Sequence, residues 1–540
     1  MGRRKVVTLY NNRYRGGYLS ERDCDTLESI RSAYEDGVSF NDLRGCLYNL
    51  DDGMIDAVIA NQSGDWLDDD DKPRGELSDS QTDMLAFGIV SKRWLCGDSV
   101  GLGKTTLVAA LYNYLKAHKT WKDQRPRLLF LTEGEDVMRQ NMRQLIRFTG
   151  DYFMGCTGRA ADAEELVGYY MSNGDVPNVI ATHSILRQTK FQELVESYRG
   201  KHGEPPFTIV AIDESAVLGK STTQIYKQAV GLFSDVNYRV CLNATEFDTN
   251  LEEFYNQLNW VDDTLLPTKT QFKKDYFIME YNPFSGYYSK PSGKYRNAEK
   301  FRNLVGYRYL ARTRKDLGAT IENCHAEVVK VPENEYQRNL LKETSQPGMA
   351  LNCPWAIDRG ANVSPQYCPK LGILVRTIKE VVQKTGSPKT QFLIYAFHKE
   401  AQQGILEVLQ YLYQNYDMDI AILNGETGSE ERADIIRRFK EGSLGVLITN
   451  VQRGLNFGNC DYVIFYEFPS VGQAVQFEGR ITRQENIRNK NVYVLLSENR
   501  ELRNFRGILS DRAKAIEAFS TTDYSMVLML LLKGGIVADV

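Results

Sequence analysis

The stretch from Asp98 to Thr106 combines glycine, lysine and threonine in a spacing that binds phosphate. An apolar run precedes it and an amphipathic run follows it, so it is predicted to join a strand to a helix. Glycines let the backbone approach an anion, and the amides at a helix N-terminus stabilise its charge. Lys104 would meet the outer phosphates, and the Thr105 hydroxyl would ligate Mg²⁺. The expected phosphate cradle consists of Gly101, Gly103, Lys104, Thr105 and Thr106.

Two carboxylates further along the chain would complete this site. Asp213 and Glu214 follow the apolar run 209–212, at the carboxyl end of a predicted strand, where open α/β sheets bind ligands. Hydrolysis of a nucleoside triphosphate needs one carboxylate for the metal and another to orient the attacking water. An isolated acidic pair is more often a solvated strand end, but the upstream phosphate loop favours function. We assign Asp213 to Mg²⁺ and Glu214 to the water of an ATP site.

A pair of arginines near the end of the chain could assist the same chemistry. Arg480 and Arg483 are three residues apart, so they share one face of a helix. Guanidinium groups stabilise the charge that develops as a terminal phosphate leaves. Alone, such a pair is more often a surface charge pair. Here the preceding motifs favour arginines that act on a nucleotide bound by the opposite domain.

Predicted strands alternate with helical patterns from about residue 77 onward. Such alternation implies βαβ crossovers and buried parallel sheets. The strands fall in two series, at 128–131, 179–181, 209–212 and 240–242, and then at 392–395, 420–423, 446–448, 463–466 and 492–495. The fold class expected is therefore α/β, with two parallel-sheet domains.

The 540 residues exceed what one hydrophobic core holds, so several segments are expected. Two capping-box patterns, beginning at Ser20 and Ser39, predict short helices near the N-terminus. We expect a small helical N-terminal module at 1–75, a first α/β domain at 76–264, a Lys- and Tyr-rich helical insert with linker at 265–365, a second α/β domain at 366–510 and a C-terminal helical tail at 511–540.

Composition narrows the class of protein. No apolar run approaches the roughly 20 residues of a membrane span, and a cytoplasmic protein of a bacterium or a virus-infected cell is expected. Nine cysteines without a CxxC pair, and five histidines away from them, indicate neither a zinc site nor a disulfide framework. The net charge of −4 excludes a uniformly basic coat, although a local basic channel could still bind nucleic acid.

The ordered motifs resemble those of superfamily 2 helicases, particularly the Swi/Snf family of ATPases. Asp98 to Thr105 resembles that family's Asp-Glu-x-Gly-Leu-Gly-Lys-Thr, and Gln81 stands where the family has an adenine-contacting glutamine. Residues 213–216 take the place of the Asp-Glu-x-His box. Two further segments, 250–261 and 312–315, resemble Swi/Snf proteins more than DEAD-box proteins.

The resemblance continues through the second predicted domain and covers about residues 77–500. Asn424-Gly425, the run 449–456 and then Gln476, Arg480 and Arg483 follow the family's order. It implies two tandem RecA-like P-loop domains, ATP and Mg²⁺ as ligands, and Gln476 near the nucleotide. Nucleic-acid backbone contacts are expected at Thr182, His183, Ser184, His398, Thr449 and Asn450.

The chain departs from the family pattern at three motif positions. Ser99 replaces an acidic residue, Ala216 replaces the histidine of the Asp-Glu-x-His box, and Glu246 replaces a proline. The last two positions belong to the coupling of hydrolysis to movement. The residues expected to bind and hydrolyse ATP remain in place, which favours an active enzyme.

The function expected is a DNA-stimulated ATPase that translocates along double-stranded DNA and remodels or displaces what is bound there. A strand-separating or fork-remodelling helicase, with single-stranded nucleic acid as a ligand, is an alternative. A nucleotide-binding scaffold with weak turnover is another. The Lys- and Tyr-rich insert could bind DNA or form an ordinary projection. An unidentified protein partner, such as transcription or recombination machinery, is also expected.

Overall fold

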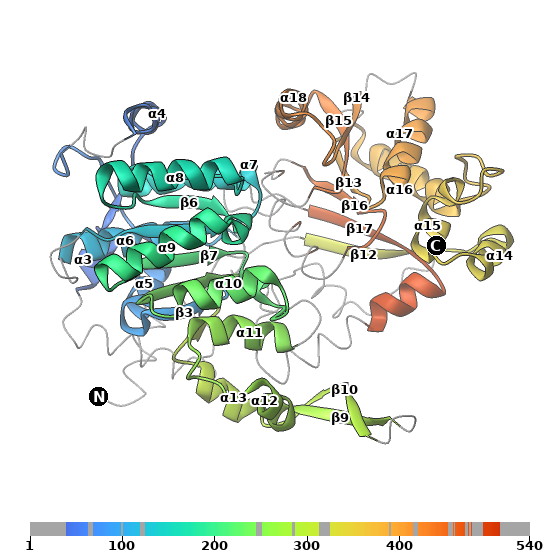
Figure 1. The fold of residues 1–540 in the computed structure, drawn as a ribbon. Coiled ribbons are helices and arrows are strands. Elements are labelled where there is room, and N and C mark those ends of the chain that lie inside the picture. The colour runs from blue at the N-terminus through green and yellow to red at the C-terminus, as the bar shows by residue number, and fades with distance from the viewer. Residues whose placement is uncertain are drawn as a thin grey trace. The chain divides into compact units, whose positions relative to one another are not determined.

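The computed structural model of the chain consists of two compact units (Figure 1). The first comprises residues up to 312 and the second begins at 324. The residues described are 39–62, 68–98, 101–118, 125–244, 251–282, 287–312, 324–387, 390–413, 419–451, 457, 460–469, 474, 477 and 490–507. The predicted tail 511–540 and residues 1–38 lie outside them. Within these ranges no helix is both long enough and apolar enough to cross a membrane.

The first unit is built on a seven-stranded sheet in the order β11-β3-β8-β7-β4-β6-β5. Every neighbouring pair is parallel, as the alternation of strands and helices predicts. Its strands are β3 (Arg93–Cys96), β4 (Leu128–Thr132), β5 (Met154–Cys156), β6 (Val179–Thr182), β7 (Ile209–Asp213), β8 (Tyr238–Leu242) and β11 (Tyr309–Leu310).

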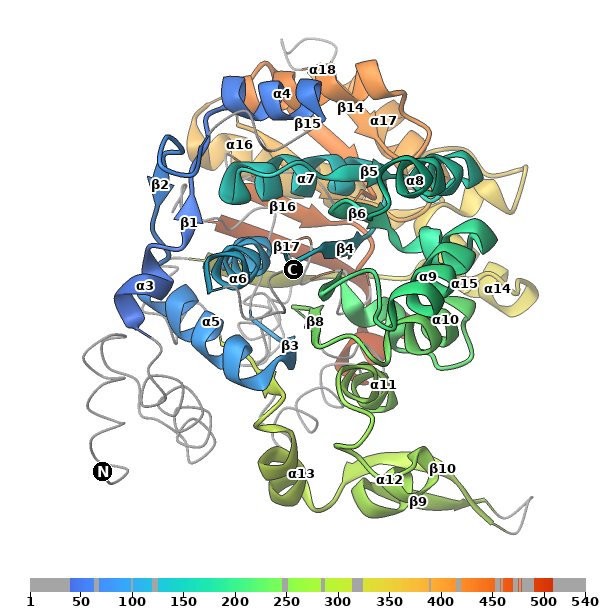
Figure 2. The same cartoon turned by 60° about the vertical axis from the view of Figure 1, so that its left-hand side comes forward.

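Helices cover both faces of this sheet (Figure 2). Alternate residues of β4 enter opposite cores, with Leu128 and Phe130 in one and Leu129 and Leu131 in the other. A strand buried on both faces therefore reads as a continuous apolar run. One face carries α3 (Phe40–Arg44), α4 (Asp52–Asn61), α5 (Asp79–Ser91), α6 (Lys104–His118) and α7 (Glu135–Thr149), and the other α8 (Ala160–Asn173), α9 (Thr189–His202), α10 (Gln224–Phe233) and α11 (Leu251–Val261).

The described part of the N-terminal segment packs onto the first sheet. Leu43 and Ile55 belong to the same hydrophobic core as the sheet, and the Leu50 amide donates to the Arg147 carbonyl at 3.1 Å. Short strands β1 (Leu47–Tyr48) and β2 (Arg74–Gly75) pair antiparallel between its helices. Ser39 caps α3 as predicted, accepting from the Asp42 amide. Residues 39–75 thus extend the first unit's core.

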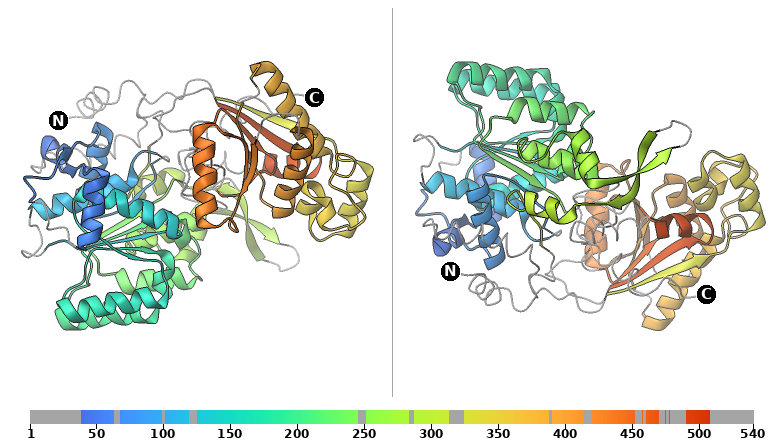
Figure 3. Two further views of the ribbon diagram at one scale, coloured as in Figure 1. Left: turned by 90° about the horizontal axis from the view of Figure 1, so that it is seen from above. Right: turned by 90° about the horizontal axis from the view of Figure 1, so that it is seen from below.

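The insert differs from the helical expectation. An antiparallel hairpin of β9 (Phe277–Asn282) and β10 (Tyr287–Tyr295) stands between α12 (Lys269–Tyr276) and α13 (Ala298–Val305). It extends away from the first unit's sheet (Figure 3). Phe272 and Phe301 anchor its base through edge-on contact with each other, 5.9 Å between ring centroids. Lys269 and Lys273 both pair with Glu252, so part of the insert's positive charge is neutralised.

The second unit holds a six-stranded parallel sheet in the order β12-β17-β16-β13-β15-β14. Its first edge strand, β12, lies in the stretch 265–365 where an insert and linker were expected. The strands are β12 (Cys324–Val331), β13 (Phe392–Tyr395), β14 (Asp419–Leu423), β15 (Leu444–Thr449), β16 (Tyr462–Phe465) and β17 (Lys490–Ser497). The helices are α14 (Glu335–Glu343), α15 (Pro347–Asn352), α16 (Pro369–Thr385), α17 (Lys399–Tyr413) and α18 (Ser429–Glu441). Two parallel α/β domains are therefore confirmed.

Candidate nucleotide site and nucleic-acid face

The predicted phosphate loop joins β3 to α6, which begins at Lys104. Gly101 and Gly103 have φ angles of 84° and 79°, a left-handed conformation that glycine adopts without strain. A Cβ atom on Gly103 would stand 2.3 Å from Gln81 Nε2, so a larger residue would also force the end of the Gln81 side chain to move. The Lys104 ammonium donates to the Asp98 carbonyl at 2.7 Å, within the loop it is expected to serve.

Gln81 lies against this loop, where the family resemblance puts it. Its Nε2 donates to the Leu102 carbonyl at 3.3 Å. Its Oε1 accepts from the Ser78 amide at 3.0 Å, which closes a capping box at the start of α5. The oxygen of the Gln81 side-chain amide thus bonds to the start of α5, and its nitrogen bonds to the phosphate loop.

The first residue of the loop is held by an arginine that sequence reasoning assigned only to a family block. Both carboxylate oxygens of Asp98 accept from Arg312, at 2.6 Å from Nη2 and 3.2 Å from Nε. Arg312 also donates to the Ser80 carbonyl at 2.6 Å. Asp98 is fully buried and Arg312 is 5% exposed. Asp98 matches the first position of the family's Asp-Glu-x-Gly-Leu-Gly-Lys-Thr, and that local motif does not indicate its partner.

The two carboxylates follow β7 at the same edge of the sheet as the phosphate loop. Strand β8 separates β7 from β3, so the two loops lie two strand spacings apart, about 10 Å. The Asp213 carboxylate accepts from Asn141 Nδ2 at 3.3 Å and from the Glu214 amide at 3.1 Å. Glu214 itself has a φ of 49°, which is uncommon for a residue with a side chain and is typical of functional sites.

These groups fit magnesium and a nucleotide. Asp213 offers a carboxylate oxygen and Thr105 a hydroxyl oxygen, and hard oxygen ligands are what Mg²⁺ prefers. Mg²⁺ is usually held by one or two carboxylates together with substrate phosphates and water, so this small set suffices. Asn141 bonds to the Asp213 carboxylate and therefore orients it.

A buried glutamine connects the loops after β7 and β8. Gln257 Oε1 accepts from Ser215 Oγ at 2.7 Å and from Asn243 Nδ2 at 3.0 Å. Gln257 is fully buried in α11. Ser215 belongs to the acidic box and Asn243 directly follows β8, so the hydrogen bonds of Gln257 join the two loops. Gln257 lies in the segment 250–261 that resembles Swi/Snf proteins, and the sequence indicates no partner for its side chain.

The predicted nucleic-acid contacts of the first unit behave differently from one another. The Thr182 hydroxyl bonds to the Thr157 carbonyl and to Ser184 Oγ, at 2.7 Å each. His183 was expected to meet phosphate, but its ring turns inward and is 2.9 Å from the Asp213 carbonyl oxygen. Burial lowers the pKa of His183 to about 4, so the ring carries no charge for a phosphate at neutral pH. A direct contact between the His183 ring and the phosphate backbone of a nucleic acid does not fit this geometry.

In the second unit, three predicted contact residues lie at or just after the ends of the neighbouring strands β13 and β15. The Asn450 side chain donates to the Phe397 carbonyl at 3.3 Å. Thr449 is fully buried and accepts from the Val451 amide. The His398 ring lies 2.5 Å from Glu467 Oε1, and its amide donates to Glu467 Oε2 at 2.9 Å. This hydrogen bond to Glu467 raises the pKa of His398 above its ordinary value.

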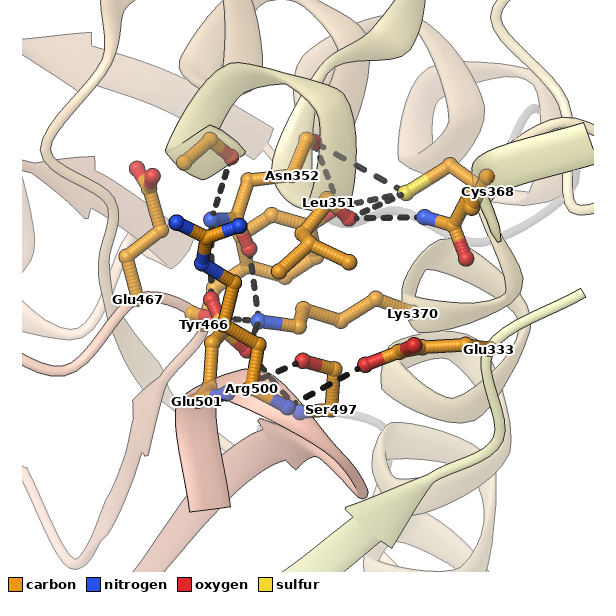
Figure 4. A network of polar contacts seen from close by, with 12 residues as sticks. Glu333, Leu351, Asn352, Cys368, Lys370, Tyr466, Glu467, Ser497, Arg500 and Glu501 are labelled. Atoms are coloured by element: carbon orange, nitrogen blue, oxygen red, sulfur yellow. Dashed lines mark hydrogen bonds and ion pairs between the residues drawn. The ribbon is translucent and has the colours of Figure 1, made fainter. Parts of the chain in front are cut away.

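A buried cation anchors the turn that carries Glu467 (Figure 4). The Lys370 ammonium donates to Glu501 Oε2 and Asn352 Oδ1 at 2.6 Å each, and to the Tyr466 carbonyl at 3.1 Å. Lys370 is 1% exposed, and three oxygens match its three donors. The cluster holds the chain just beyond β16 in place, and with it the partner of His398.

Several predicted residues lie outside the described part of the chain. They are Gln476, Arg480 and Arg483 of the second unit's expected nucleotide face, and Ser99 and Glu246 among the departures. Ala216, the third departure, lies in the short 3₁₀ helix Ser215–Leu218 that follows Glu214.

Comparison with known proteins gives matches over both units. Residues 372–485 match the helicase conserved C-terminal domain. The chain is 23% identical over 444 residues to the SWI/SNF-related matrix-associated actin-dependent regulator of chromatin subfamily A-like protein 1 of Xenopus laevis, covering 79% of this chain and 42% of that protein. It is 30% identical over 118 residues to the ATP-dependent RNA helicase DeaD of Buchnera aphidicola, covering 22% and 19%. The chain thus spans less than half the length of these relatives.

Two solved structures resemble the chain over most of its length. One is the SWI2/SNF2 ATPase core of Sulfolobus solfataricus in complex with dsDNA, at 16% identity and a TM-score of 0.37, covering 81% of this chain and 92% of that one. The other is the Hef helicase domain of Pyrococcus furiosus, at 13% identity and a TM-score of 0.47, covering 79% and 97%.

The phosphate loop and the acidic pair lie in the first unit and the helicase C-terminal domain match lies in the second, so the chain is similar to helicase-like ATPases. The similarity that extends over 79% of the chain is to a Swi/Snf-related protein.

Proposed function

We propose that the chain hydrolyses ATP and uses the energy to move along double-stranded DNA, displacing or remodelling proteins or strands bound there. The observation that carries the proposal is the placement of the phosphate loop and the acidic pair at one carboxyl edge of the first parallel sheet. That edge is where open α/β sheets bind nucleotides.

Each residue of the site has a role in the proposed hydrolysis. Lys104 and the amides of its loop hold the phosphates, and Thr105 and Asp213 hold the metal. Bound magnesium neutralises charge on the phosphate oxygens. Glu214 orients the attacking water, and we assign to Arg480 and Arg483 the stabilisation of charge on the leaving phosphate. Arg480→Ala should therefore retain nucleotide binding while hydrolysis falls steeply.

Duplex DNA is preferred over RNA as the track because of the extent of the similarities. The relative matched over 79% of this chain is named as a regulator of chromatin, whereas the RNA helicase DeaD matches over 22%. The hydroxyl and amide groups of Thr182, Ser184 and Asn450 suit phosphate and sugar contacts, which read little sequence. Affinity should accordingly fall with rising salt.

The test is ATP hydrolysis without nucleic acid and with duplex DNA, single-stranded DNA or RNA. Lys104→Ala and Glu214→Gln serve as inactive controls. Stimulation by duplex, together with displacement of the third strand of a triplex without unwinding, supports the proposal. Absence of stimulation by every nucleic acid would contradict it and favour a nucleotide-binding scaffold.

A second candidate is a strand-separating or fork-remodelling helicase. The observation in its favour is the β9–β10 hairpin, which extends from the first unit and could be inserted at a junction (Figure 3). Unwinding of a forked duplex that is lost when residues 279–293 are replaced by a short Gly-Ser turn, while triplex displacement is unaffected, distinguishes this function.

A further inference from the structure

The Thr182–Ser184 segment is packed tightly against a neighbouring loop. The hydroxyls of Thr182 and Ser184 both bond to the Thr157 carbonyl, at 2.7 and 3.4 Å. Gly158 has a φ of 88°, and a Cβ on it would lie 1.9 Å from Ser184 Oγ. Because no space separates the two loops, displacement of one by a ligand must displace the other.

His183, between these two hydroxyls in sequence, extends in the other direction. Strand β4 separates β6, which precedes His183, from β7, which ends at Asp213. Although β4 lies between these two strands, Nε2 of the imidazole is 2.9 Å from the Asp213 carbonyl oxygen. A carbonyl can only accept, so Nε2 of the neutral ring carries the hydrogen. The ring is 8% exposed and is thus committed to this contact.

The bonded carbonyl belongs to the peptide that joins the two predicted ATPase carboxylates. The Asp213 carbonyl and the Glu214 amide are parts of one planar unit, so holding the oxygen fixes the orientation of both. That amide in turn donates to the Asp213 carboxylate at 3.1 Å. The next rotatable backbone bond, at Glu214, has the unusual φ of 49°. A rotation of the plane would therefore move the metal carboxylate and the water-orienting carboxylate together.

We propose that His183 is a positioning residue that couples the 182–184 segment, once it is occupied by nucleic acid, to the Asp213-Glu214 peptide. It supplies a histidine contact to the acidic box, whose own fourth residue is Ala216. The inference rests on the proposed function, because it concerns how nucleic acid stimulates hydrolysis. Catalysis is sensitive to such placement, since a misplacement of about 1 Å costs about a hundredfold in rate.

Two substitutions separate the hydrogen bond from the shape of the ring. His183→Phe keeps a ring without a donor, and His183→Gln keeps a donor without the ring. In His183→Phe, the kcat of duplex-stimulated hydrolysis should fall roughly 10- to 100-fold while the KM for ATP stays within about twofold. His183→Gln should recover most of the lost rate. His118→Phe, at an exposed histidine stacked on Tyr114, is the matched control and should behave as wild type.

Thermal unfolding and duplex affinity are measured on the same full-length proteins. If His183→Phe does not fold, His183→Met takes its place, since methionine is about as long as glutamine and has no donor. Wild-type stimulation in the donor-free variant overturns the proposal, as does equal loss in the glutamine variant. Normal kcat at saturating duplex with weakened duplex affinity also overturns it, because His183 would then be a direct contact. Failure of the proposed function is separate: the wild-type protein itself would show no stimulation by nucleic acid.

Discussion

The carboxylate of Asp98 and the guanidinium of Arg312, 214 residues apart in sequence, form a buried two-point ion pair. Asp98 begins the phosphate loop, and Arg312 follows β11, the edge strand of the first sheet. The Arg312 amide also donates to Asp98 Oδ1 at 3.0 Å. The pair therefore fastens the nucleotide loop to the chain segment that follows the edge strand β11.

Removing one partner of this pair should be strongly destabilising. Arg312→Ala leaves a buried carboxylate without its compensating cation, which typically costs about 3–5 kcal/mol. The free energy of unfolding from urea titration measures the loss. Adding Asp98→Asn should restore a large part of it, because the second substitution removes the isolated charge. A cost below about 1 kcal/mol for Arg312→Ala, typical of an exposed pair, would show that the contact is unimportant.

Gly103→Ala should impair nucleotide binding more than folding. The alanine would have to adopt a φ of 79°, which costs about 1–2 kcal/mol. Its Cβ would also stand 2.3 Å from Gln81 Nε2, so the Gln81 side-chain amide would have to move. Fluorescence titration measures the affinity for nucleotide, and urea titration measures the free energy of unfolding. The matched control is Gly231→Ala in α10, where nothing lies within 4 Å and stability should be unchanged or higher. Unaltered affinity in Gly103→Ala would refute the role of this loop.

Gln257→Leu tests the connection between the acidic box and the motif after β8. Leucine suits the apolar face of α11 but cannot accept from Ser215 and Asn243, and a buried polar group that loses its partner costs about 1–3 kcal/mol. Gln257→Glu keeps an acceptor oxygen for both donors and serves as the comparison, though it buries a charge and loses the Nε2 donor to the Glu253 carbonyl. We expect a lower unfolding midpoint in Gln257→Leu. An unchanged or higher midpoint would mean that the network contributes nothing to stability.

The sequence predicted those parts of the site that depend on local patterns. The strand-loop-helix of residues 94–115 and the acidic pair after β7 could be read from apolar runs and glycine spacing. Contacts between distant segments could not: nothing adjacent to Asp98 or Gln257 names Arg312 or Ser215 as its partner. The direction of a side chain was equally hidden. Thr182 and Ser184 face Thr157, whereas His183 faces Asp213, at the point where β6 ends and the 3₁₀ helix His183–Arg187 begins.

The hairpin of the insert and strand β12 were not predicted, for another physical reason. Alternation of Lys, Tyr and Gly in residues 277–295 is compatible with a helix or with a hairpin, and pairing between β9 and β10 decides between them. Strand β12 was missed because an edge strand of the second sheet need not be continuously apolar, and Glu327 and Lys330 interrupt its pattern.

Protonation of His398 should give the second unit a pH-dependent stability. The hydrogen bond to Glu467 raises the pKa of His398 above its ordinary 6.5, with weaker contributions from the charges of Glu400 and Glu501. A raised pKa means that the folded state binds the proton more tightly than the unfolded state. The stabilisation is therefore complete below pH 6.5 and is lost as pH rises through the folded-state pKa. Unfolding midpoints of wild type and His398→Gln, measured between about pH 6 and pH 9, should converge as pH increases.

Glu467→Gln should remove the same pH dependence, because the imidazolium then lacks its anionic partner. His325→Gln, at a histidine whose side chain is 67% exposed, is the control in the same unit and should keep the wild-type profile. A difference between wild type and His398→Gln that grows with pH would contradict the assignment, since it would require a folded-state pKa below the ordinary value.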